Sequence, residues 1–241
     1  MITVITMAGL GSRFKKAGYR QPKYEIEVRG HSLFYWSMQS LLGLPSEKTF
    51  FIVRKEDHAK GFIEAECAAL NIRPFVIEID YLTSGQAETA MLASPYWEKD
   101  EALLIYNIDT YVEAYQMKAQ DIAGDGWIPC FLGEGDHWSF VRLDEKGDAV
   151  EIREKKRISP HCTLGAYYFR TAELYETLYN EYYLSGNYAL DAGERYVAPL
   201  YNYLIEKKGG SVRIVDIDEK FVHVLGTPEE VEVFRREGEA Q

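Results

Sequence analysis

Glycines and cationic side chains crowd the first two dozen residues of this chain. Gly9 and Gly11 are followed by Arg13, and Lys23 comes shortly afterwards. Glycines let a backbone approach a ligand without an intervening Cβ, and adjacent backbone N–H groups bind anions. The guanidinium and the ammonium add two positive charges near the same loop. The pattern predicts a phosphate site, which we interpret as a site for a triphosphate.

Three phosphate-binding patterns can be compared with this loop, beside the alternative of a glycine turn with incidental surface cations. The dinucleotide fingerprint G-x-G-x-x-G fails, because Phe14 stands where the third glycine is required. A Walker A loop needs Gly-Lys followed by Ser or Thr, which does not occur. The residue types of the third pattern, A-x-G-x-G-[ST]-R followed by P-K, occur here in the same order as Ala8, Gly9, Gly11, Ser12, Arg13, Pro22 and Lys23, although Ala8 directly precedes Gly9 without the intervening residue.

A second candidate site follows an apolar run at residues 103–106. Asn107 and Asp109 come directly after this run, at what we expect to be the carboxyl end of a strand. Mg²⁺ favours one or two carboxylates together with phosphate oxygens. Asp109 alone could equally begin a turn or a helix. Beside the N-terminal motif, we interpret it as a metal ligand.

A third group of charged residues lies at 154–157. Glu154 and Lys155 precede a glycine-containing aromatic segment at 163–169. A lysine there could bind a substrate phosphate as a point charge. The alternative is that Lys155, Lys156 and Arg157 form an exposed charge run, which is the commoner role of such a segment.

The elements that must position these residues alternate between strands and helices in the first half of the chain. Residues 1–6 have the apolar, β-branched pattern of a buried parallel strand. The alternation predicts right-handed βαβ units and a mainly parallel sheet. Ligands bind such sheets beyond the carboxyl ends of the strands, so we expect the loops at 9–11 and 84–85 and Asp109 on one rim. The other strands are expected at 49–53, 75–79 and 103–106, and the helices at 31–44, 56–70 and 86–93.

After about residue 126 the pattern changes to shorter strands separated by turns. No Ser- or Pro-rich linker, repeat or low-complexity tract occurs, so we expect a single domain over residues 1–241. The strands are expected at 128–132, 139–143, 149–153, 163–169 and 211–217, and the helices at 172–183, 195–207 and from 228 onward.

The composition is that of a globular protein with an acidic surface. Hydrophobic residues make up 46% and charged residues 27% of the chain, and the formal net charge is −11. Nucleic acid would be repelled on average, so we expect no nucleic-acid partner. We also expect no membrane association, because no apolar run is long enough for a membrane helix and no secretory leader is recognisable. The widely spaced Cys67, Cys130 and Cys162 suggest neither a disulfide framework nor a zinc site, and they fit a reducing cytoplasm.

The order of these motifs, with Gly226-Thr227-Pro228-Glu229 near the end, resembles the nucleoside-triphosphate:sugar-1-phosphate nucleotidyltransferases. The resemblance spans almost the whole chain. It is closest to a compact capsule- and surface-polysaccharide branch that includes cytidylyltransferases. Similarity to that branch is carried by residues 11–19 (Gly-Ser-Arg-Phe-x-x-x-Gly-Tyr), 138–140, 154–159 and 194–197.

The resemblance implies a fold and a set of roles. The fold would be a three-layer α/β/α arrangement with a mixed, mainly parallel, Rossmann-like sheet, as in family-A glycosyltransferases. Residues 1–125 would form the nucleotide-binding half and 126–241 the acceptor-side half. Arg13 and Lys23 would act on the triphosphate, Asp109 on Mg²⁺ and Lys155 on the acceptor phosphate. The wider set would bind the nucleotide through Ala8, Gly9, Gly11, Ser12, Gly85, Glu88 and Asn107, and the acceptor also through Gly165 and Glu194.

One departure from the family pattern concerns the metal. In the related enzymes a second metal-binding aspartate lies two residues before the Gly-Thr pair, where this chain has Val224. Water could complete the metal shell, or His223 or Glu194 could substitute. We expect His223 to be structural, because imidazole is a poor ligand for Mg²⁺.

The resemblance implies a Mg²⁺-dependent nucleotidyltransferase that joins a nucleoside triphosphate to a sugar-1-phosphate or similar phosphomonoester and releases pyrophosphate. The alternatives are a family-A glycosyltransferase, which would have no use for Arg13 and Lys23 together, and a catalytically inactive nucleotide-binding protein. The acceptor and the oligomeric state, including a homo-oligomer, stay open.

Glu88 is the basis for an expectation about the base. An ionised carboxylate only accepts hydrogen bonds, and cytosine offers the N4 amine as a donor. We therefore expect CTP to be favoured, with GTP next, because the N1–H and N2 amine of guanine are also donors. The alternative is that Glu88 is a first-turn acid of the following helix and does not meet the base.

Overall fold

The first half of the chain forms parallel strands joined by helices, as the alternation predicts. The computed structural model describes residues 1–185 and 193–238. The main elements of this half are β1 (Ile2–Thr6), α1 (Ser12–Lys16), α2 (Leu33–Gln39), β4 (Lys48–Arg54), α3 (Lys60–Ala69), β5 (Pro74–Ile79), α4 (Gln86–Met91) and β6 (Leu103–Asn107). Strand β1 pairs in parallel with β4 and β6, and β4 pairs in parallel with β5. The carboxyl ends of these strands therefore meet at one edge of the sheet.

The second half extends the same sheet with mainly antiparallel strands. Its elements are β8 (Gly126–Leu132), β9 (Ser139–Leu143), β10 (Ala149–Glu154), β11 (His161–Thr163), β12 (Ala166–Phe169), α5 (Ala172–Tyr179), α6 (Ala198–Lys208), β13 (Val212–Ile217) and α7 (Pro228–Glu237). Over the described residues the sheet has ten strands in the order β10-β9-β11-β8-β12-β6-β1-β4-β5, with β13 also paired to β8. Strand β12 joins the two halves, because it pairs antiparallel with both β6 and β8.

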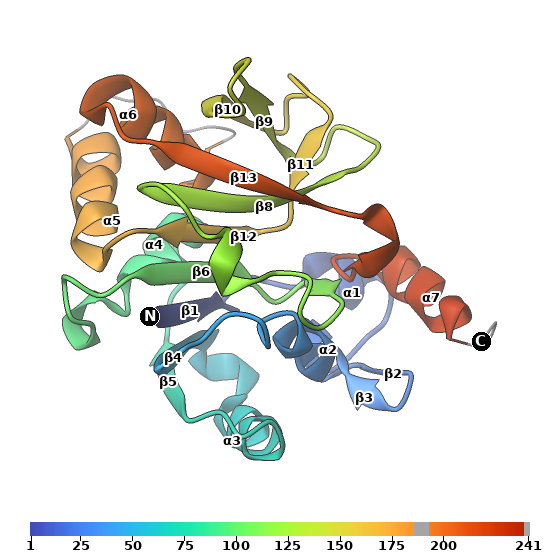
Figure 1. Cartoon of the computed structure of the whole chain (residues 1–241). Coiled ribbons are helices and arrows are strands. Elements are labelled where there is room, and N and C mark those ends of the chain that lie inside the picture. Colours follow the sequence, from blue (N-terminus) through green and yellow to red (C-terminus); the bar gives the residue numbers. More distant parts are fainter. Residues whose placement is uncertain (186–192, 239–241) are drawn as a thin grey trace.

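Short elements bring the two ends of the chain together. The hairpin strands are β2 (Glu27–Val28) and β3 (His31–Ser32), and a second small sheet pairs β7 (Thr110–Val112) with β14 (Val222–Val224). Helix α7 packs beside β2, so the last helix lies next to the first thirty residues (Figure 1). Short helical turns complete the structure at Lys23–Glu25, Lys55–Asp57, Ser94–Tyr96, Ala119–Asp121, Asn180–Leu184 and Glu219–Phe221.

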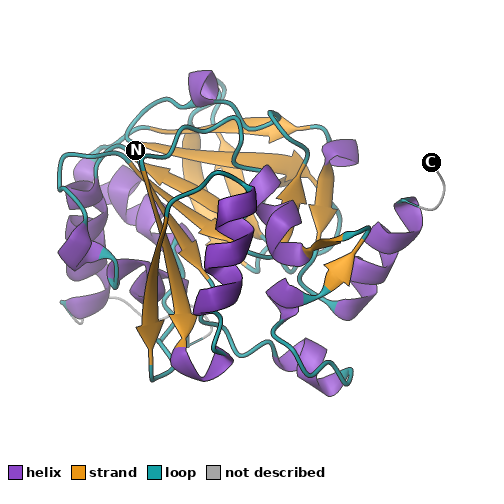
Figure 2. Ribbon diagram, turned by 90° about the horizontal axis from the view of Figure 1, so that it is seen from below, coloured by secondary structure: helices purple, strands orange, loops and turns teal. Residues whose placement is uncertain are grey.

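Helices cover both faces of the sheet, which confirms the predicted three-layer α/β/α fold (Figures 1 and 2). One core lies between the sheet and α4, α5 and α6, and it includes Ile105, Ala90 and Tyr175. The other lies against α2 and α3, and it includes Phe51 and Ile63. Both cores draw buried residues from both halves of the chain.

The segment at 163–169 is two strands and not the single strand that we expected. Strand β11 ends at Thr163 and β12 begins at Ala166, with Leu164 and Gly165 between them. Gly165 has φ +76°, a conformation that side chains rarely adopt, and its carbonyl accepts from the N–H of Asn107 at 3.0 Å. The break therefore brings Gly165 to the end of β6.

Three helices begin later than their predicted ranges. The helix expected at 31–44 begins at Leu33, because Ser32 caps it by accepting from the N–H of Tyr35 at 3.0 Å. The helix expected at 56–70 begins at Lys60, after the turn at Lys55–Asp57. The helix expected at 195–207 begins at Ala198, where Pro199 suits the first turn.

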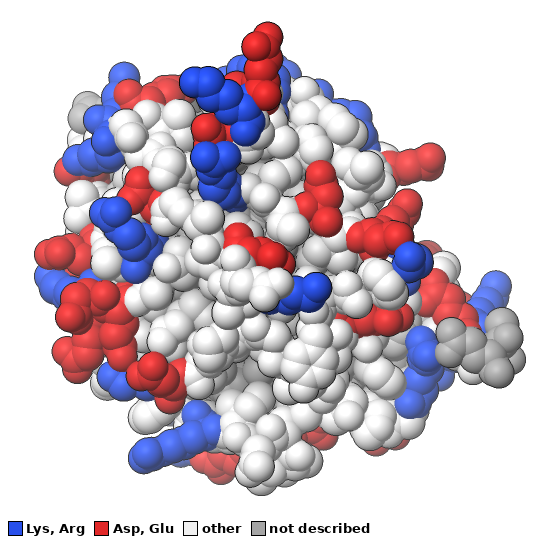
Figure 3. Space-filling view, in the orientation of Figure 1, with Lys and Arg blue, Asp and Glu red and all other residues white. Residues whose placement is uncertain are grey.

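Acidic and basic side chains are interspersed over the face of the molecule that Figure 3 shows. None of the helices in the described part of the chain has the length and apolar character that a membrane crossing requires. Cys67, Cys130 and Cys162 are all buried as free thiols.

Candidate active site

A cleft of about 1130 Å³ opens beyond the carboxyl ends of β1 and β6. Both halves of the chain line it, which agrees with the expectation that ligands bind at this edge of a parallel sheet. Most of the predicted site residues are on its walls. The structure brings together Ala8, Gly9, Gly11, Ser12, Arg13, Lys23, Gly85, Asn107, Asp109, Gly165 and Glu194.

Buried side chains on either side of the N-terminal loop anchor it to the core. Met7 continues β1 by donating its N–H to the carbonyl of Ile52 at 3.0 Å, and both Met7 and Ala8 are buried. Helix α1 follows the loop directly, and its Phe14 is 2% exposed. This anchor leaves Arg13, the preceding residue, exposed on the cleft. The loop thus presents its backbone and a guanidinium to a ligand.

Lys23 and Asp109 form an ion pair across the cleft. Lys23 Nζ lies 2.9 Å from Asp109 Oδ2, and the side chains are 19% and 37% exposed. Lys23 is positioned by the turn at Lys23–Glu25, whose Tyr24 is buried. A positive group therefore already stands against the carboxylate that the sequence assigns to the metal.

The side chains around Asp109 fit a Mg²⁺ ion that takes most of its ligands from phosphate and water. They do not form a metal site in which the protein supplies every ligand. Within the described ranges, no group of three or more His, Cys, Asp or Glu side chains is placed to hold a metal. Mg²⁺ usually takes one or two carboxylates and fills its shell with phosphate oxygens and water. A Cβ at Gly226 would lie 3.9 Å from Asp109 Oδ2, so the glycine leaves space beside this oxygen.

Asn107 links the end of β6 to the loop before α4. Its Oδ1 accepts from the amide Nε2 of Gln86 and lies 3.5 Å from Thr6 Oγ1. Gly85 precedes Gln86 with φ +142°, and a Cβ there would stand 2.6 Å from the carbonyl oxygen of Arg195. Gly85 is therefore required for the close approach of this loop to residue 195.

Glu88 is not brought to the cleft. Its Oε2 accepts from the N–H of Ser84 at 2.8 Å and lies 3.8 Å from Arg195 Nη1. It therefore closes the loop before its own helix, as the alternative in the sequence analysis describes. Gln86, which no motif in the sequence marks as a site residue, lines the cleft instead.

On the acceptor side, Glu154 lines the cleft and Lys155 does not. Glu154 accepts from Ser139 Oγ, and its side chain is 10% exposed. Lys155 directly follows the end of β10 and has φ +51°, so its side chain does not continue the alternation of the strand, and its Nζ donates to Tyr196 Oη at 2.6 Å. Burial alone would lower the pKa of Lys155, but the Tyr196 hydrogen bond and nearby Glu154 and Glu194 raise it above its ordinary value. The ammonium therefore stays charged. It contacts Tyr196, which lines the cleft, and does not line the cleft itself.

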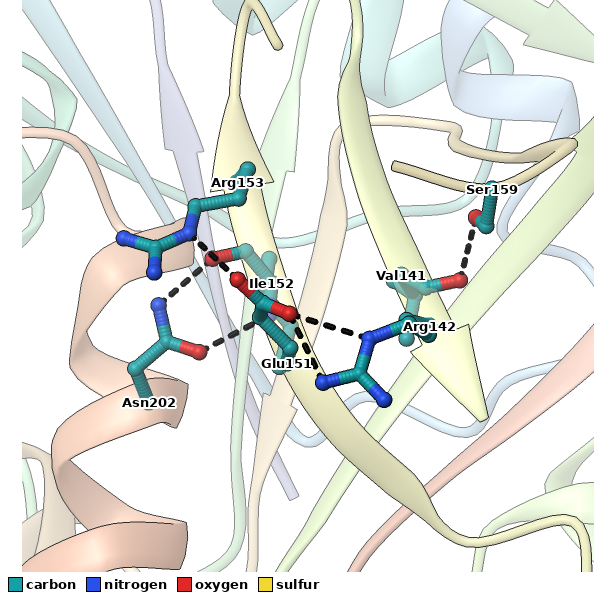
Figure 4. Close-up of polar contacts among 7 residues, drawn as sticks. All are labelled: Val141, Arg142, Glu151, Ile152, Arg153, Ser159 and Asn202. Carbon is teal, nitrogen blue, oxygen red and sulfur yellow. Dashed lines mark hydrogen bonds and ion pairs between the residues drawn. The ribbon is translucent and has the colours of Figure 1, made fainter. Parts of the chain in front are cut away.

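Helix α6 fixes the strand that carries Glu154 (Figure 4). Strand β10 is at the end of the sheet, and Asn202 of α6 binds its free edge. Asn202 Oδ1 accepts from the N–H of Ile152 at 2.7 Å, and its Nδ2 donates to the carbonyl of Ile152 at 2.5 Å. On the neighbouring position, Glu151 binds Arg142 and Arg153, and these hydrogen bonds hold the pKa of its carboxyl below the ordinary value. The far wall of the cleft is thus tied to the helix layer.

His223 lies outside the cleft lining, in agreement with a structural role. Its ring stacks on Tyr111 with centroids 5.3 Å apart, and its Nδ1 lies 2.9 Å from Glu237 Oε2. Val224 does line the cleft, where it offers no donor atom to a cation.

A glycine loop, two cations and a carboxylate at the carboxyl ends of parallel strands are typical of α/β proteins that bind phosphate groups. Solved structures place the chain more closely. A nucleoside-diphosphate-sugar pyrophosphorylase from Vibrio cholerae RC9 is 33% identical, with a TM-score of 0.87 over 98% of this chain and 100% of that one. The chain therefore belongs to the nucleoside-diphosphate-sugar pyrophosphorylase family, and it is an enzyme of the nucleotidyltransferase type.

More distant structures share the fold. An inositol-1-phosphate CTP transferase from T. maritima is 16% identical, with a TM-score of 0.80 over 99% of this chain and 94% of that one. A proposed glucose-1-phosphate thymidylyltransferase from Bacillus anthracis is 13% identical, with a TM-score of 0.79 over 99% and 95%. No family model matches the chain, and no curated protein matches it.

Proposed function

We propose that the enzyme transfers a nucleotidyl group from a nucleoside triphosphate, with CTP favoured, to a sugar-1-phosphate or similar phosphomonoester in a Mg²⁺-dependent reaction. The observation that carries this proposal is the convergence of the N-terminal loop, Arg13 and the Lys23–Asp109 pair on one cleft. The second wall, with Glu154 and Glu194, leaves room for an acceptor in the same space.

The reaction needs no protein nucleophile. A phosphate oxygen of the acceptor attacks the α-phosphorus, a new P–O bond forms, and the bond to the bridging oxygen breaks to release pyrophosphate. The protein has to bring two polyanions into line and neutralise their charge. Arg13 is exposed on the cleft and can follow the triphosphate, and the loop backbone at 9–12 can donate to its oxygens.

Lys23 has two partners in this proposal. In the free enzyme its ammonium neutralises Asp109. When the triphosphate enters, Lys23 can turn to the phosphates, because its flexible stem carries a compact charge. Asp109 would then hold the Mg²⁺, which supplies positive charge to the phosphate oxygens when it is bound.

Gln86 supports the preference for CTP. One N–H of its amide Nε2 donates to Asn107, which leaves a second N–H and the carbonyl oxygen of Gln86, and the proposal places the carbonyl oxygen, an acceptor, toward the base. Cytosine presents the N4 amine as a donor, whereas uracil and thymine present an acceptor oxygen at that position. Opposing two acceptors costs on the order of 1–3 kcal/mol, which is roughly a ten- to hundredfold preference.

The test is release of pyrophosphate from CTP, UTP, dTTP and GTP with Mg²⁺ and a panel of sugar-1-phosphates and other phosphomonoesters. We expect CTP to give the highest kcat/KM, Gln86→Leu to reduce this preference, and the matched control Glu88→Gln to keep it. A preference for UTP or dTTP would contradict the role of Gln86. Consumption of a finished sugar nucleotide without pyrophosphate release would instead indicate a glycosyltransferase.

We also propose, from the sequence resemblance, a role in capsule or surface-polysaccharide precursor synthesis in the cytoplasm. One continuous domain with a nucleotide-binding half at 1–125 and an acceptor-side half at 126–241 belongs to the same proposal. It is supported by the two cores that both halves share.

A further inference from the structure

We propose that Glu230 supplies the second carboxylate of the divalent-cation site at Asp109. This inference rests on the proposed function, because it concerns the metal of that reaction. Strand β14 brings Val224 to the cleft, and a valine has no atom that can bind a cation. Glu230 follows Val224 in the chain, in the first turn of α7, and it also lines the cleft.

The start of α7 is held directly against Asp109. The N–H of Leu225 donates to the carbonyl of Asp109 at 2.8 Å, which fixes the chain just before the helix. Thr227 then caps α7 by accepting from the N–H of Glu230 at 3.2 Å. These two hydrogen bonds fix the backbone positions of Asp109 and Glu230 relative to each other.

Gly226 marks the space that the two carboxylates share. A Cβ on Gly226 would lie 3.4 Å from Glu230 Oε2 and 3.9 Å from Asp109 Oδ2. Asp109, just before β7, and Glu230, in α7, thus both reach the same small region at the cleft wall. Two carboxylates with room for phosphate oxygens are the protein ligands that Mg²⁺ commonly takes.

Glu230 Oε2 is buried, and it has no hydrogen-bond partner among residues 1–185 and 193–238. A buried carboxylate oxygen without a donor is costly, because it has lost its water and gained nothing in exchange. Asp109, by contrast, is neutralised by Lys23. The unpartnered oxygen beside a metal-type carboxylate is the feature that a bound cation would explain.

A capping role is the competing explanation for Glu230. Thr227-Pro228-Glu229-Glu230 matches the capping box, in which the fourth residue accepts from the N–H of the first. The Thr227 half of the box is present, but Oε2 of Glu230 does not complete it. Glutamine serves a capping box as well as glutamate does, so Glu230→Gln separates the two roles.

The test is a titration of the enzyme with Mn²⁺ in the presence of CTP and without an acceptor, in which water-proton relaxation measures the bound Mn²⁺. We expect Glu230→Gln to need roughly tenfold or more Mn²⁺ for half-saturation, the loss typical of a weakened metal site. The matched control Glu229→Gln, on the exposed side of the same turn, should bind Mn²⁺ as the wild type does. Without metal, Glu230→Gln should unfold at the same temperature as the wild type or higher, because it removes the charge from a group whose buried Oε2 has no hydrogen-bond partner in the described part of the chain.

Two results would overturn the proposal. One is Mn²⁺ binding by Glu230→Gln within about twofold of the wild type while Asp109→Asn binds weakly, which would leave Asp109 as the metal ligand and remove Glu230. The other is a lower unfolding temperature of metal-free Glu230→Gln with unchanged Mn²⁺ binding, which would assign Glu230 to the helix alone. If Asp109→Asn also binds normally, the proposed metal site fails as a whole, and pyrophosphate release by the wild type still decides the reaction separately.

Discussion

Arg13 is the side chain whose role can be tested with the least damage to the fold. It is exposed, whereas its neighbour Phe14 carries the packing of the loop. If the guanidinium stabilises charge that develops on the triphosphate, Arg13→Ala should lower kcat about a hundredfold or more, the usual loss for one such donor. Steady-state pyrophosphate release measures this. Lys16→Ala is the matched control, because Lys16 is exposed on the same short helix and does not line the cleft. Near-normal turnover of folded Arg13→Ala would contradict the assignment.

Asp109→Asn tests the carboxylate without changing its shape. The amide keeps a side chain that can form hydrogen bonds but removes the charge that pairs with Lys23 and that we propose binds Mg²⁺. We expect turnover to fall about a hundredfold or more, and to be partly restored by raised Mg²⁺ or by Mn²⁺. A titration of turnover against metal concentration checks this, and an unchanged metal dependence would make Asp109 a turn residue.

Single side chains show what sequence could and could not predict about the site. The N-terminal motif, Asn107 and Asp109 were predictable, because strand order alone brings them to one edge. That Glu154 and not Lys155 lines the cleft was not predictable, because it follows from the positive φ of Lys155. That Gln86 and not Glu88 lines it depends in the same way on local structure, because Glu88 accepts a hydrogen bond from the backbone of Ser84. In both cases a local conformation that the residue types do not specify decides which side chain reaches the cleft.

At the scale of elements, strand β10 depends on α6 for its position. Asn202→Leu keeps the branched shape and the number of heavy atoms of the side chain but leaves the N–H and C=O of Ile152 without their partner. We expect a loss of about 1–3 kcal/mol in the free energy of unfolding. We also expect a higher KM for the acceptor than in the wild type, with the nucleotide KM unchanged, because Glu154 ends this strand. Denaturant unfolding and the two KM values measure this.

The control for this element is Glu206→Gln, an exposed position on the same helix. It should leave both the stability and the acceptor KM as they are. Equal changes in the two KM values of Asn202→Leu would mean that α6 supports the fold in general rather than the acceptor wall.

Element types were predicted well and their limits less well. The parallel strands carried a clear apolar signal, and their order followed from the helices between them. The break at Leu164–Gly165 was hidden, because an aromatic, apolar segment looks continuous until the chain has to turn toward Asn107. The pairing of β7 with β14 was not visible either, since it joins two three-residue strands, one from the middle of the chain and one near its C-terminal end.

At the scale of the whole molecule, the two chain ends form a common core under the candidate site. Phe14 and Ile26, near the N-terminal loop, cluster with Leu225, Val231 and Phe234 near the C-terminus. Nothing in the local sequence marks this contact, because it depends on the path of the whole chain. The N-terminal loop and helix α1, which carries Arg13, are therefore supported by the last helix.

Phe234→Ala tests this support. The ring is 1% exposed, it packs on Trp36 and Tyr111, and the guanidinium of Arg29 lies 4.6 Å from its centroid. Removing a buried phenylalanine typically costs about 3–5 kcal/mol, which corresponds to a fall in Tm of roughly 6–20 °C for a chain of this size. Because the cluster includes Phe14, we expect the nucleotide KM to rise as well.

The exposed neighbour Val233 provides the matched control. Its side chain is 58% exposed, so Val233→Ala should leave Tm and both KM values close to those of the wild type. Calorimetry should show a single transition for both variants, since the chain ends and the two larger cores share residues from both halves. A separate low-temperature transition in Phe234→Ala, with the nucleotide KM unchanged, would mean that the last helix unfolds independently and does not support the phosphate loop.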